Sequence, residues 1–351
     1  MTLDTSEQNY NSDSITSPSI NENEVDQIQS LQNIFSDIKK ELSKTIVGQE
    51  DAIEKLFLCL LSRGHGLLMG VPGLAKTLLV NSLAQTTSLS FGRIQFTPDL
   101  MPSDVTGTEI LQQRDTGGGR DFTFIKGPIF ANVILADEIN RTPPKTQSAL
   151  LEAMQEQHVT VAGKNHELAK PFFVLATQNP IEQEGTYPLP EAQLDRFMFI
   201  IKMDYPEREQ ELSIAKQTTV GGTPKLQEVI TGEKLIEYQD LTEKIPVPDH
   251  VYELAVDLVR KTRPKSKDAP DWVKEVVEWG AGPRAIQFLI KSAKAQAIIN
   301  GNYIVSEQDL ESVAEPVLNH RIITNFHARS EGITSSQVIQ RLIKELSKAN
   351  D

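Results

Sequence analysis

Residues Leu67–Thr77 read LLMGVPGLAKT, and the organisation of the rest of the chain follows from this stretch. The short apolar run from Gly66 to Met69 predicts a buried strand, and the residues after Thr77 predict a helix. The glycine-containing segment between them approximates the pattern G-x-x-x-x-G-K-[ST]. In that pattern backbone N–H groups surround phosphate oxygens, the lysine reaches the β- and γ-phosphates, and the hydroxyl ligates Mg²⁺. The stretch therefore predicts a strand, a phosphate-binding loop and a helix.

Nine consecutive residues form the candidate phosphate loop. Ala75 stands where the general pattern has its second fixed glycine. Alanine is the smallest substitute, and a residue that enters a helix can have an ordinary negative φ, so we expect the loop to close. The alternative is a Gly/Pro turn that binds nothing. The candidate nucleotide-binding residues of this loop are Gly70, Val71, Pro72, Gly73, Leu74, Ala75, Lys76, Thr77 and Leu78.

Composition places the chain among ordinary globular proteins. Its 351 residues are enough for two domains with a proper core. The longest apolar runs have the length of strands and no basic-then-apolar leader opens the chain, so we expect no signal peptide, no transmembrane helix and a cytoplasmic location. The single cysteine, Cys59, lies in a helical pattern and is interpreted as a small core residue. The scattered histidines show no metal-ligand spacing, so no zinc site is assigned.

The charge is acidic and part of it is local. A net charge of −13 argues against a nonspecific nucleic-acid binder. Residues 1–30 contain six acidic residues and no Lys or Arg, which leaves −7 of the total of −13 for the remainder. The start of the chain is polar and has few apolar residues, so it cannot bury enough surface to offset the entropy of ordering. We therefore predict that residues 1–27 form a disordered acidic tail.

A second chemical signal follows the apolar run at residues 132–136. This run predicts a strand, and it ends in the adjacent carboxylates Asp137 and Glu138. In a parallel α/β sheet ligands lie at the carboxyl ends of the strands, so the pair would lie beside the phosphate loop. An acidic pair in this position can also be only a turn or a helix N-cap. With a phosphate loop upstream, we interpret Asp137 as a Mg²⁺ ligand beside Thr77, and Glu138 as the group that polarises the attacking water.

Two more polar residues are candidates for the same chemistry. Asn179 follows the apolar strand at residues 172–177 and could orient water between Glu138 and a γ-phosphate. A turn asparagine before Pro180 is the alternative. Arg196 lies at the end of a short helix predicted at residues 189–197. An exposed arginine there is usually a solvated charge, but a neighbouring subunit could supply a positive charge to a phosphate from this position.

Beyond Tyr205 strand patterns give way to helical ones. We therefore predict an α/β core over residues 28–204 and a helical domain over 205–351. Two glycine-containing segments, 107–127 and 158–168, predict hairpins inserted in the core. The predicted helices of the second domain cover residues 206–217, 232–243, 249–261, 272–278, 283–299, 306–318 and 335–349. Pro283 suits the first position of a helix, so Arg284 falls in the first turn, where it can face an anion or simply lie on the surface.

The order of these pieces is more specific than any one of them. They read IVGQE (46–50), GVPGLAKT (70–77), VILADEINR (133–141), LATQNP (175–180), LPEAQLDRF (189–197) and GPRA (282–285). Together they resemble the MoxR family of AAA+ ATPases, in the clade with hairpin insertions that includes magnesium-chelatase motor subunits. The resemblance covers about residues 28–330. Ala75 departs from the general loop pattern but matches how the loop of this family usually reads.

The resemblance implies an AAA+ core, which is an αβα sandwich around a parallel sheet, followed by an α-helical lid. It also implies ATP and Mg²⁺ as ligands. By resemblance, Val47 and Gly48 line the adenine pocket, Asp137 and Glu138 are the Walker B pair, and Asn179 is sensor 1.

The resemblance also implies assembly. Arg196 resembles the arginine finger that acts on ATP bound by the adjacent subunit, and Arg284 resembles sensor 2 of the lid. The family forms rings, typically hexamers, and works as a chaperone-like motor, often beside partners with a von Willebrand factor A domain.

Three functions compete at this point. The first is a Mg²⁺-dependent ATPase ring that remodels or activates partner proteins. The second is a nucleic-acid motor, which is disfavoured because the hairpin at residues 158–170 holds Lys164, Lys170 and Glu167 but no aromatic stacking platform. The third is an ATP-gated scaffold, and the presence of both Asp137 and Glu138 argues against it.

Overall fold

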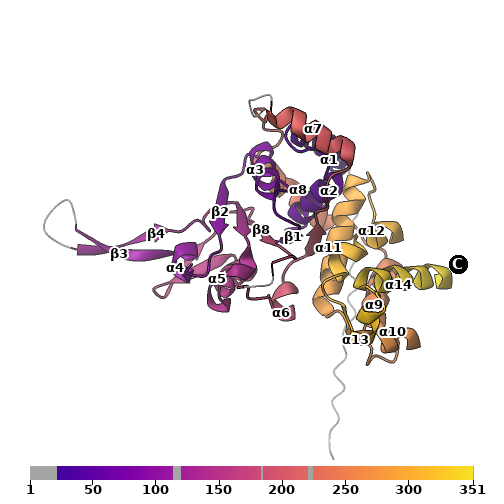
Figure 1. Ribbon diagram of the computed structural model, residues 1–351. Coiled ribbons are helices and arrows are strands. Elements are labelled where there is room, and N and C mark those ends of the chain that lie inside the picture. The colour runs from indigo at the N-terminus through magenta and orange to yellow at the C-terminus, as the bar shows by residue number, and fades with distance from the viewer. Residues whose placement is uncertain (1–21, 114–119, 183–184, 220–223, 351) are drawn as a thin grey trace, which may run out of the picture.

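The computed structural model describes residues 22–113, 120–182, 185–219 and 224–350 (Figure 1). Most of the predicted tail, residues 1–21, lies outside the described residues, as does the glycine-rich turn of the first hairpin. Helix α1 (Glu22–Leu42) already covers residues 22–27, so the predicted extent of the tail is wrong. Acidic side chains near its start and Lys39 and Lys40 in its last turn complement the helix dipole.

A five-stranded parallel sheet forms the centre of the molecule. Its strands are arranged in the order β2-β5-β8-β1-β9, and every neighbouring pair is parallel. They are β1 (Gly66–Met69), β2 (Phe91–Gln95), β5 (Val133–Asp137), β8 (Phe173–Gln178) and β9 (Phe199–Lys202). Because all five strands run the same way, the segments that follow them meet at one edge of the sheet, and the segments that precede them meet at the opposite edge.

Alternation along the strands divides the core into two layers. Leu68, Leu135 and Leu175 belong to one buried cluster, and Ile134 and Ala176 belong to the other. Successive side chains of a strand point to opposite faces, so a strand buried on both faces reads as one apolar run. Helices α1, α2 (Glu50–Leu61) and α3 (Lys76–Thr86) cover the first face. Helices α4 (Pro102–Thr106) and α5 (Pro144–Glu156) cover the second (Figure 1). The predicted αβα core is thereby confirmed.

Both predicted hairpins are present. One pairs β3 (Gly107–Gln113) with β4 (Arg120–Lys126), and the other pairs β6 (His158–Val161) with β7 (Lys164–Glu167). The β3–β4 hairpin projects from the body of the molecule (Figure 1). The two hairpins contact one another, because the Phe124 ring stacks on His166 at 3.9 Å between centroids and Lys164 pairs with Glu109 at 3.0 Å.

The C-terminal part is mainly helical, as predicted. Its helices are α7 (Arg208–Thr219), α8 (Gly232–Lys244), α9 (Asp249–Lys261), α10 (Asp271–Val276), α11 (Pro283–Ile299), α12 (Glu307–Leu318), α13 (Phe326–Ser330) and α14 (Ser335–Asn350). The expectation of one helix over residues 272–278 is wrong, because β10 (Val277–Trp279) pairs antiparallel with β11 (Ile323–Thr324). A pairing of two or three residues is too short to produce a periodic signal in sequence.

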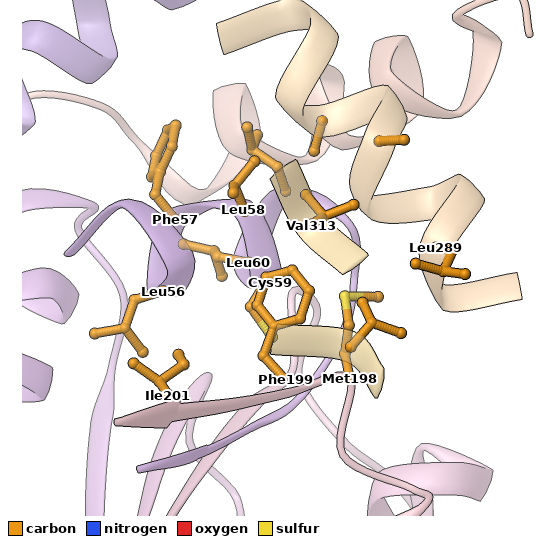
Figure 2. Packing of buried hydrophobic residues seen from close by; sticks show 14 of the residues in the cluster. Leu56, Phe57, Leu58, Cys59, Leu60, Met198, Phe199, Ile201, Leu289 and Val313 are labelled. Carbon is orange, nitrogen blue, oxygen red and sulfur yellow. The ribbon is translucent and has the colours of Figure 1, made fainter. Parts of the chain in front are cut away.

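One continuous core joins the C-terminal helices to the sheet (Figure 2). Helix α2 buries all of its last six residues, and the edge strand β9 contributes Phe199 and Ile201. Leu289 from α11 and Val313 from α12 pack into the same cluster. Cys59 is part of this core, as predicted, and burial raises the pKa of its thiol. Among the described residues, no helix is both long and apolar enough to cross a membrane.

His65 lies at the start of β1 and ties three elements together. Its Nδ1 accepts a hydrogen bond from the backbone N–H of Val174 at 3.1 Å, so Nε2 carries the proton and donates to the Met154 carbonyl at 3.1 Å. Burial lowers the pKa of His65 to about 4.

We predict that His65 makes stability depend on pH. Its pKa falls from 6.5 to about 4 on folding, so between these values the unfolded chain binds more protons. The stabilisation from neutral His65 is complete above pH 6.5 and is lost as the pH falls toward 4, which amounts to roughly 3 kcal/mol. We would measure the free energy of unfolding by denaturant titration at several pH values in this range. This free energy should depend less steeply on pH in His65→Gln than in the wild type. Substitution of the exposed His250 by Gln should leave the pH dependence unchanged, and the same pH dependence in both variants would contradict the assignment.

Candidate active site

The phosphate loop joins β1 to α3 and lies at the carboxyl edge of the sheet. Pro72, Gly73 and Ala75 are exposed, whereas Leu74 is buried and anchors the loop on the core. Lys76 is the first residue of α3, so the unpaired N–H groups of the first helical turn face the loop. Such a helix start favours anions, and among the described residues no atom beyond Gly73 and its chain neighbours lies within 4 Å of the position that a Cβ on Gly73 would occupy. The space above Gly73 is therefore suitable for phosphate groups.

The expectation that Ala75 has a negative φ is wrong. Ala75 adopts φ 56° and ψ 25°, which is the left-handed region, just before α3 begins. A Cβ in this region lies close to the following carbonyl oxygen, which is why the general pattern has glycine at the position. The loop does close with Ala75 in place, but at a conformational cost of roughly 1–2 kcal/mol.

Lys76 connects the loop to a group of carboxylates. Its ammonium donates to the Gly70 carbonyl at 2.6 Å. Partial burial lowers the pKa of Lys76, while the charges of Asp137, Glu138 and Glu182 act in the opposite direction. These three side chains therefore lie in the electrostatic environment of the loop lysine, as the parallel sheet requires.

A threonine hydroxyl on the neighbouring strand holds the acidic pair in place. Thr177 Oγ1 donates to Asp137 Oδ1 at 2.7 Å and accepts the Glu138 N–H at 2.8 Å. Arg93 Nη2 donates to the other oxygen of Asp137 at 2.7 Å. The Asp137 side chain is 13% exposed. A fixed carboxylate next to the phosphate loop suits a hard cation such as Mg²⁺. Thr77, the predicted second ligand, is the second residue of α3 and is half-buried.

Glu138 leaves β5 in the left-handed conformation, with φ 56°. Its carboxylate accepts a hydrogen bond from Gln95 Nε2 at 3.0 Å and pairs with Arg141 Nε at 3.1 Å. Gln95 belongs to β2, the strand on the other side of β5 from β8. The uncommon backbone conformation directs Glu138 differently from a residue that continues the strand, as is frequent at functional sites.

Asn179 follows β8 and is 4% exposed. Its Oδ1 accepts the Ile181 N–H at 3.2 Å, and its amide hydrogen-bonds to Glu182. The pKa of Glu182 is lowered, chiefly by its hydrogen bond from Arg141. Asn179 therefore belongs to the polar group that surrounds Lys76 and Glu138.

The loop with Val47 and Gly48 lies against the segment after β9. A Cβ on Gly48, which has φ 73°, would meet the side chain of Gln210 at 2.8 Å, and Gln49 Nε2 donates to the Asp204 carbonyl at 2.8 Å. A Cβ on Gly70 would meet the Met203 carbonyl at 2.9 Å, so the same segment also borders the phosphate loop. The predicted adenine and phosphate residues are therefore close together.

The two predicted arginines lie at the opposite edge of the sheet. Arg196 precedes β9, which is parallel to β1, whereas the phosphate loop follows β1. A four-residue strand of about 13 Å separates the two edges. Arg196 and Arg284 line one cleft of about 360 Å³ together with Arg63 and Lys291. No carboxylate side chain of the described residues lines that cleft. The structure thus groups Arg284 with Arg196 and not with Lys76.

Comparisons with known proteins agree with this architecture. A family model described as "ATPase family associated with various cellular activities (AAA)" matches residues 65–199, and an AAA lid domain model matches residues 271–342. The chain is 42% identical to Chaperone MoxR1 of Mycobacterium tuberculosis, over 88% of this chain and 80% of that protein. It is 40% identical to YeaC of Bacillus subtilis, over 90% of this chain and 95% of that protein. A crystal structure of a candidate ATPase from Cytophaga hutchinsonii superposes with a TM-score of 0.84 at 42% identity, and the match covers 91% of this chain and 96% of that one.

The chain belongs to the MoxR-type AAA+ ATPases. The resemblance and the fold class predicted from sequence are thereby confirmed.

Sequence reasoning missed several partners of the acidic pair in this MoxR-type ATPase. Thr177 lies inside a predicted strand, so its position next to Asp137 depends on which strands are neighbours. The same holds for Arg93 and Gln95 on β2. Arg141 carried a local signal, because it lies three residues after Glu138 in a short helical turn.

We predict that Ala75→Gly raises the free energy of unfolding. Glycine adopts the left-handed region without a Cβ penalty, and only part of this gain is offset by greater entropy of the unfolded chain, so the net increase is up to about 1 kcal/mol. Ala215→Gly is the matched control, because Ala215 is exposed inside helix α7. That change should lower the free energy of unfolding by roughly 0.5–1 kcal/mol. Equal losses in both variants, measured by denaturant unfolding, would contradict a left-handed Ala75.

Proposed function

We propose that this protein is a Mg²⁺-dependent ATPase that works as a ring, in which the nucleotide held by one subunit is hydrolysed with arginines from the next. The ring would use hydrolysis to remodel or activate partner proteins. The observation that carries the proposal is the separation of two charged groups to opposite edges of a parallel sheet. Lys76, Asp137 and Glu138 gather at the carboxyl edge, and Arg196 and Arg284 gather at the amino edge.

The carboxyl edge offers all the groups needed to bind ATP and activate water. Gly70 to Thr77 would hold the phosphates, and Lys76 would contact the β- and γ-phosphates. Thr77 and Asp137 would hold Mg²⁺, which neutralises charge on the phosphates when it is bound. Glu138 would accept a proton from the attacking water, and Asn179 would orient that water.

The amino edge would complete the site of a neighbouring subunit. Neither Arg196 nor Lys291 makes an ion pair within the described chain, and the cleft that they share carries four cations in a protein of net charge −13. A cluster of cations favours an anionic ligand, and the developing charge of a transferred phosphoryl group is such a ligand. In a ring the amino edge of one sheet can face the carboxyl edge of the next, because head-to-tail contacts repeat around a closed rotation.

The proposed action on partner proteins rests on similarity to a relative. A relative bears the name Chaperone MoxR1, which supports a chaperone-like action for this chain. We further propose a hexameric ring, a cytoplasmic location and a partner with a von Willebrand factor A domain. A nucleic-acid track is disfavoured because Lys164 of the second hairpin is already paired with Glu109.

We predict different defects for Lys76→Ala and Glu138→Gln. Loss of the Lys76 cation should weaken both ATP binding and hydrolysis. Glu138→Gln should keep binding and reduce turnover by about 10²–10⁴-fold, the usual loss when a general base is removed. Equilibrium nucleotide binding and steady-state phosphate release measure the two effects. Wild-type turnover in Glu138→Gln would rule out its assignment as the base.

We predict that Arg196→Ala binds ATP normally but hydrolyses it far more slowly, since arginine fingers contribute ~10³–10⁵ in rate. Mixing Arg196→Ala with Lys76→Ala should restore part of the activity, because an Arg196-bearing subunit then meets an intact phosphate loop. Arg284→Ala should be complemented by Lys76→Ala in the same way. If mixed rings form and stay inactive, the arginines do not act between subunits.

A further inference from the structure

Asp195 is a carboxylate that contacts two arginines of the C-terminal part, Arg284 and Arg321. It follows the short helix α6 (Glu191–Leu194) and immediately precedes Arg196. Its Oδ1 accepts a hydrogen bond from Arg321 Nε at 2.8 Å, and its Oδ2 accepts one from Arg284 Nη1 at 3.3 Å. One side chain therefore links the segment that carries Arg196 to both α11 and the turn that follows α12.

The contact between Asp195 and Arg321 is part of the folded core. The Arg321 side chain is 2% exposed, and it also donates to the backbone carbonyls of Asp195 at 2.9 Å and Phe197 at 2.7 Å. The neighbouring His320 contacts the Phe197 carbonyl through Nε2 at 3.1 Å. A buried guanidinium with this many acceptors is costly to release, because each broken contact leaves a polar group unpaired. The turn that follows α12 is thus fixed to residues 195–198.

The link to Arg284 is of a different kind. The Arg284 side chain is 37% exposed, and Asp195 is its ion-pair partner among the described residues. A half-exposed pair of this type is weak, so a phosphate could replace the carboxylate without loss to the fold. Arg284 occupies the first turn of α11, and Gln287, Phe288 and Lys291 extend the same helix face along the cleft that contains Arg196.

A carboxylate at position 195 offsets repulsion between neighbouring cations. Arg196, Arg284 and Lys291 line one cleft and repel one another, whereas Asp195 attracts Arg284 through their ion pair. The Arg321 guanidinium lies 5.1 Å from the centroid of the Phe288 ring, so α11 is also packed against the fixed side of this arrangement. Arg284 therefore pairs with a carboxylate that Arg321 fixes, and it lines the same cleft as Arg196.

We infer that Asp195, fixed by Arg321, is a positioning residue that holds Arg284 beside Arg196 so that both arginines reach the nucleotide of the neighbouring subunit together. The inference rests on the proposed function, in which these arginines act between subunits. It adds a role for two residues that do not touch the nucleotide, and it gives the turn after α12 a part in positioning the arginines.

The test uses Asp195→Asn in the full-length protein. This change keeps the size and one acceptor oxygen but removes the charge that attracts Arg284. We expect ATP affinity to stay at the wild-type value and kcat to fall roughly tenfold, the equivalent of about 1.4 kcal/mol of barrier. Asp268→Asn is the matched control, because Asp268 pairs with Arg260 in the same helical domain but away from the cleft, and its kcat should not change.

Complementation separates positioning from a general structural defect. An equimolar mixture of Asp195→Asn with Lys76→Ala should regain activity, since Lys76→Ala supplies intact arginines and Asp195→Asn supplies an intact phosphate loop. About a quarter of the junctions in randomly mixed rings have this order. A mixture of Asp195→Asn with Arg196→Ala should show no more than the residual turnover of Asp195→Asn, because neither subunit supplies a correctly positioned pair of arginines. A general structural defect in Asp195→Asn would leave the turnover of both mixtures low.

The outcomes that overturn the inference are distinct. Wild-type kcat in Asp195→Asn, or rescue by Arg196→Ala instead of Lys76→Ala, would refute it. If Asp195→Asn does not fold, Asp195→Glu takes its place, because the charge on Arg321 remains compensated while the carboxylate is displaced by one methylene. The same pattern of rescue is expected. If Arg196→Ala and Lys76→Ala fail to complement each other, the proposed function itself is wrong, and that result is separate from the Asp195 test.

Discussion

All strands of the central sheet run in one direction, and this constraint places different chemistry at its two edges. The carboxyl edge carries the phosphate loop after β1, Asp137 at the end of β5 and Asn179 after β8. The amino edge carries Arg196, three residues before β9. A single chain therefore separates these two groups of charged residues by about one strand length. In the proposed ring, the arginines would act on the nucleotide of a neighbouring subunit, because side-chain motion within one chain does not bridge this distance.

Two non-glycine residues in left-handed conformations lie where the sheet meets the site. Ala75 immediately precedes α3, and Glu138 immediately follows β5. Both conformations are unfavourable for residues with a Cβ, and both persist because their neighbours fix the chain. For Glu138 the fixing contact is Thr177, whose hydroxyl holds its N–H and the Asp137 carboxylate at once. For Ala75 it is the burial of Leu74 on one side and the start of α3 on the other.

The sequence predicted the helices and strands better than it predicted which of them lie side by side. Buried strands such as β5 and β8 were recognisable because a strand covered on both faces reads as one apolar run, and the polar residues that follow them were recognisable as a site. Gln95 and Thr177 were not, since their roles depend on strand order, which no local pattern encodes. The left-handed Ala75 was missed because alanine has no local preference for that region. The short β10–β11 pairing was missed because Val277 is equally compatible with the end of a helix.

Packing decides how the backbone that carries the amino-edge arginines can move. Met198 and Phe199, which follow Arg196, share one buried cluster with Leu289 of α11 and Val313 of α12 (Figure 2). Displacing α11 from β9 would open this cluster to water at about 25 cal/mol per Å² of apolar surface, which costs far more than a half-exposed ion pair contributes. The backbones that carry Arg196 and Arg284 therefore stay together while the subunit stays folded, and the Asp195 ion pair acts only on the direction of the Arg284 side chain. In the proposed ring, the two arginines would then approach or leave a nucleotide when whole subunits rotate against each other.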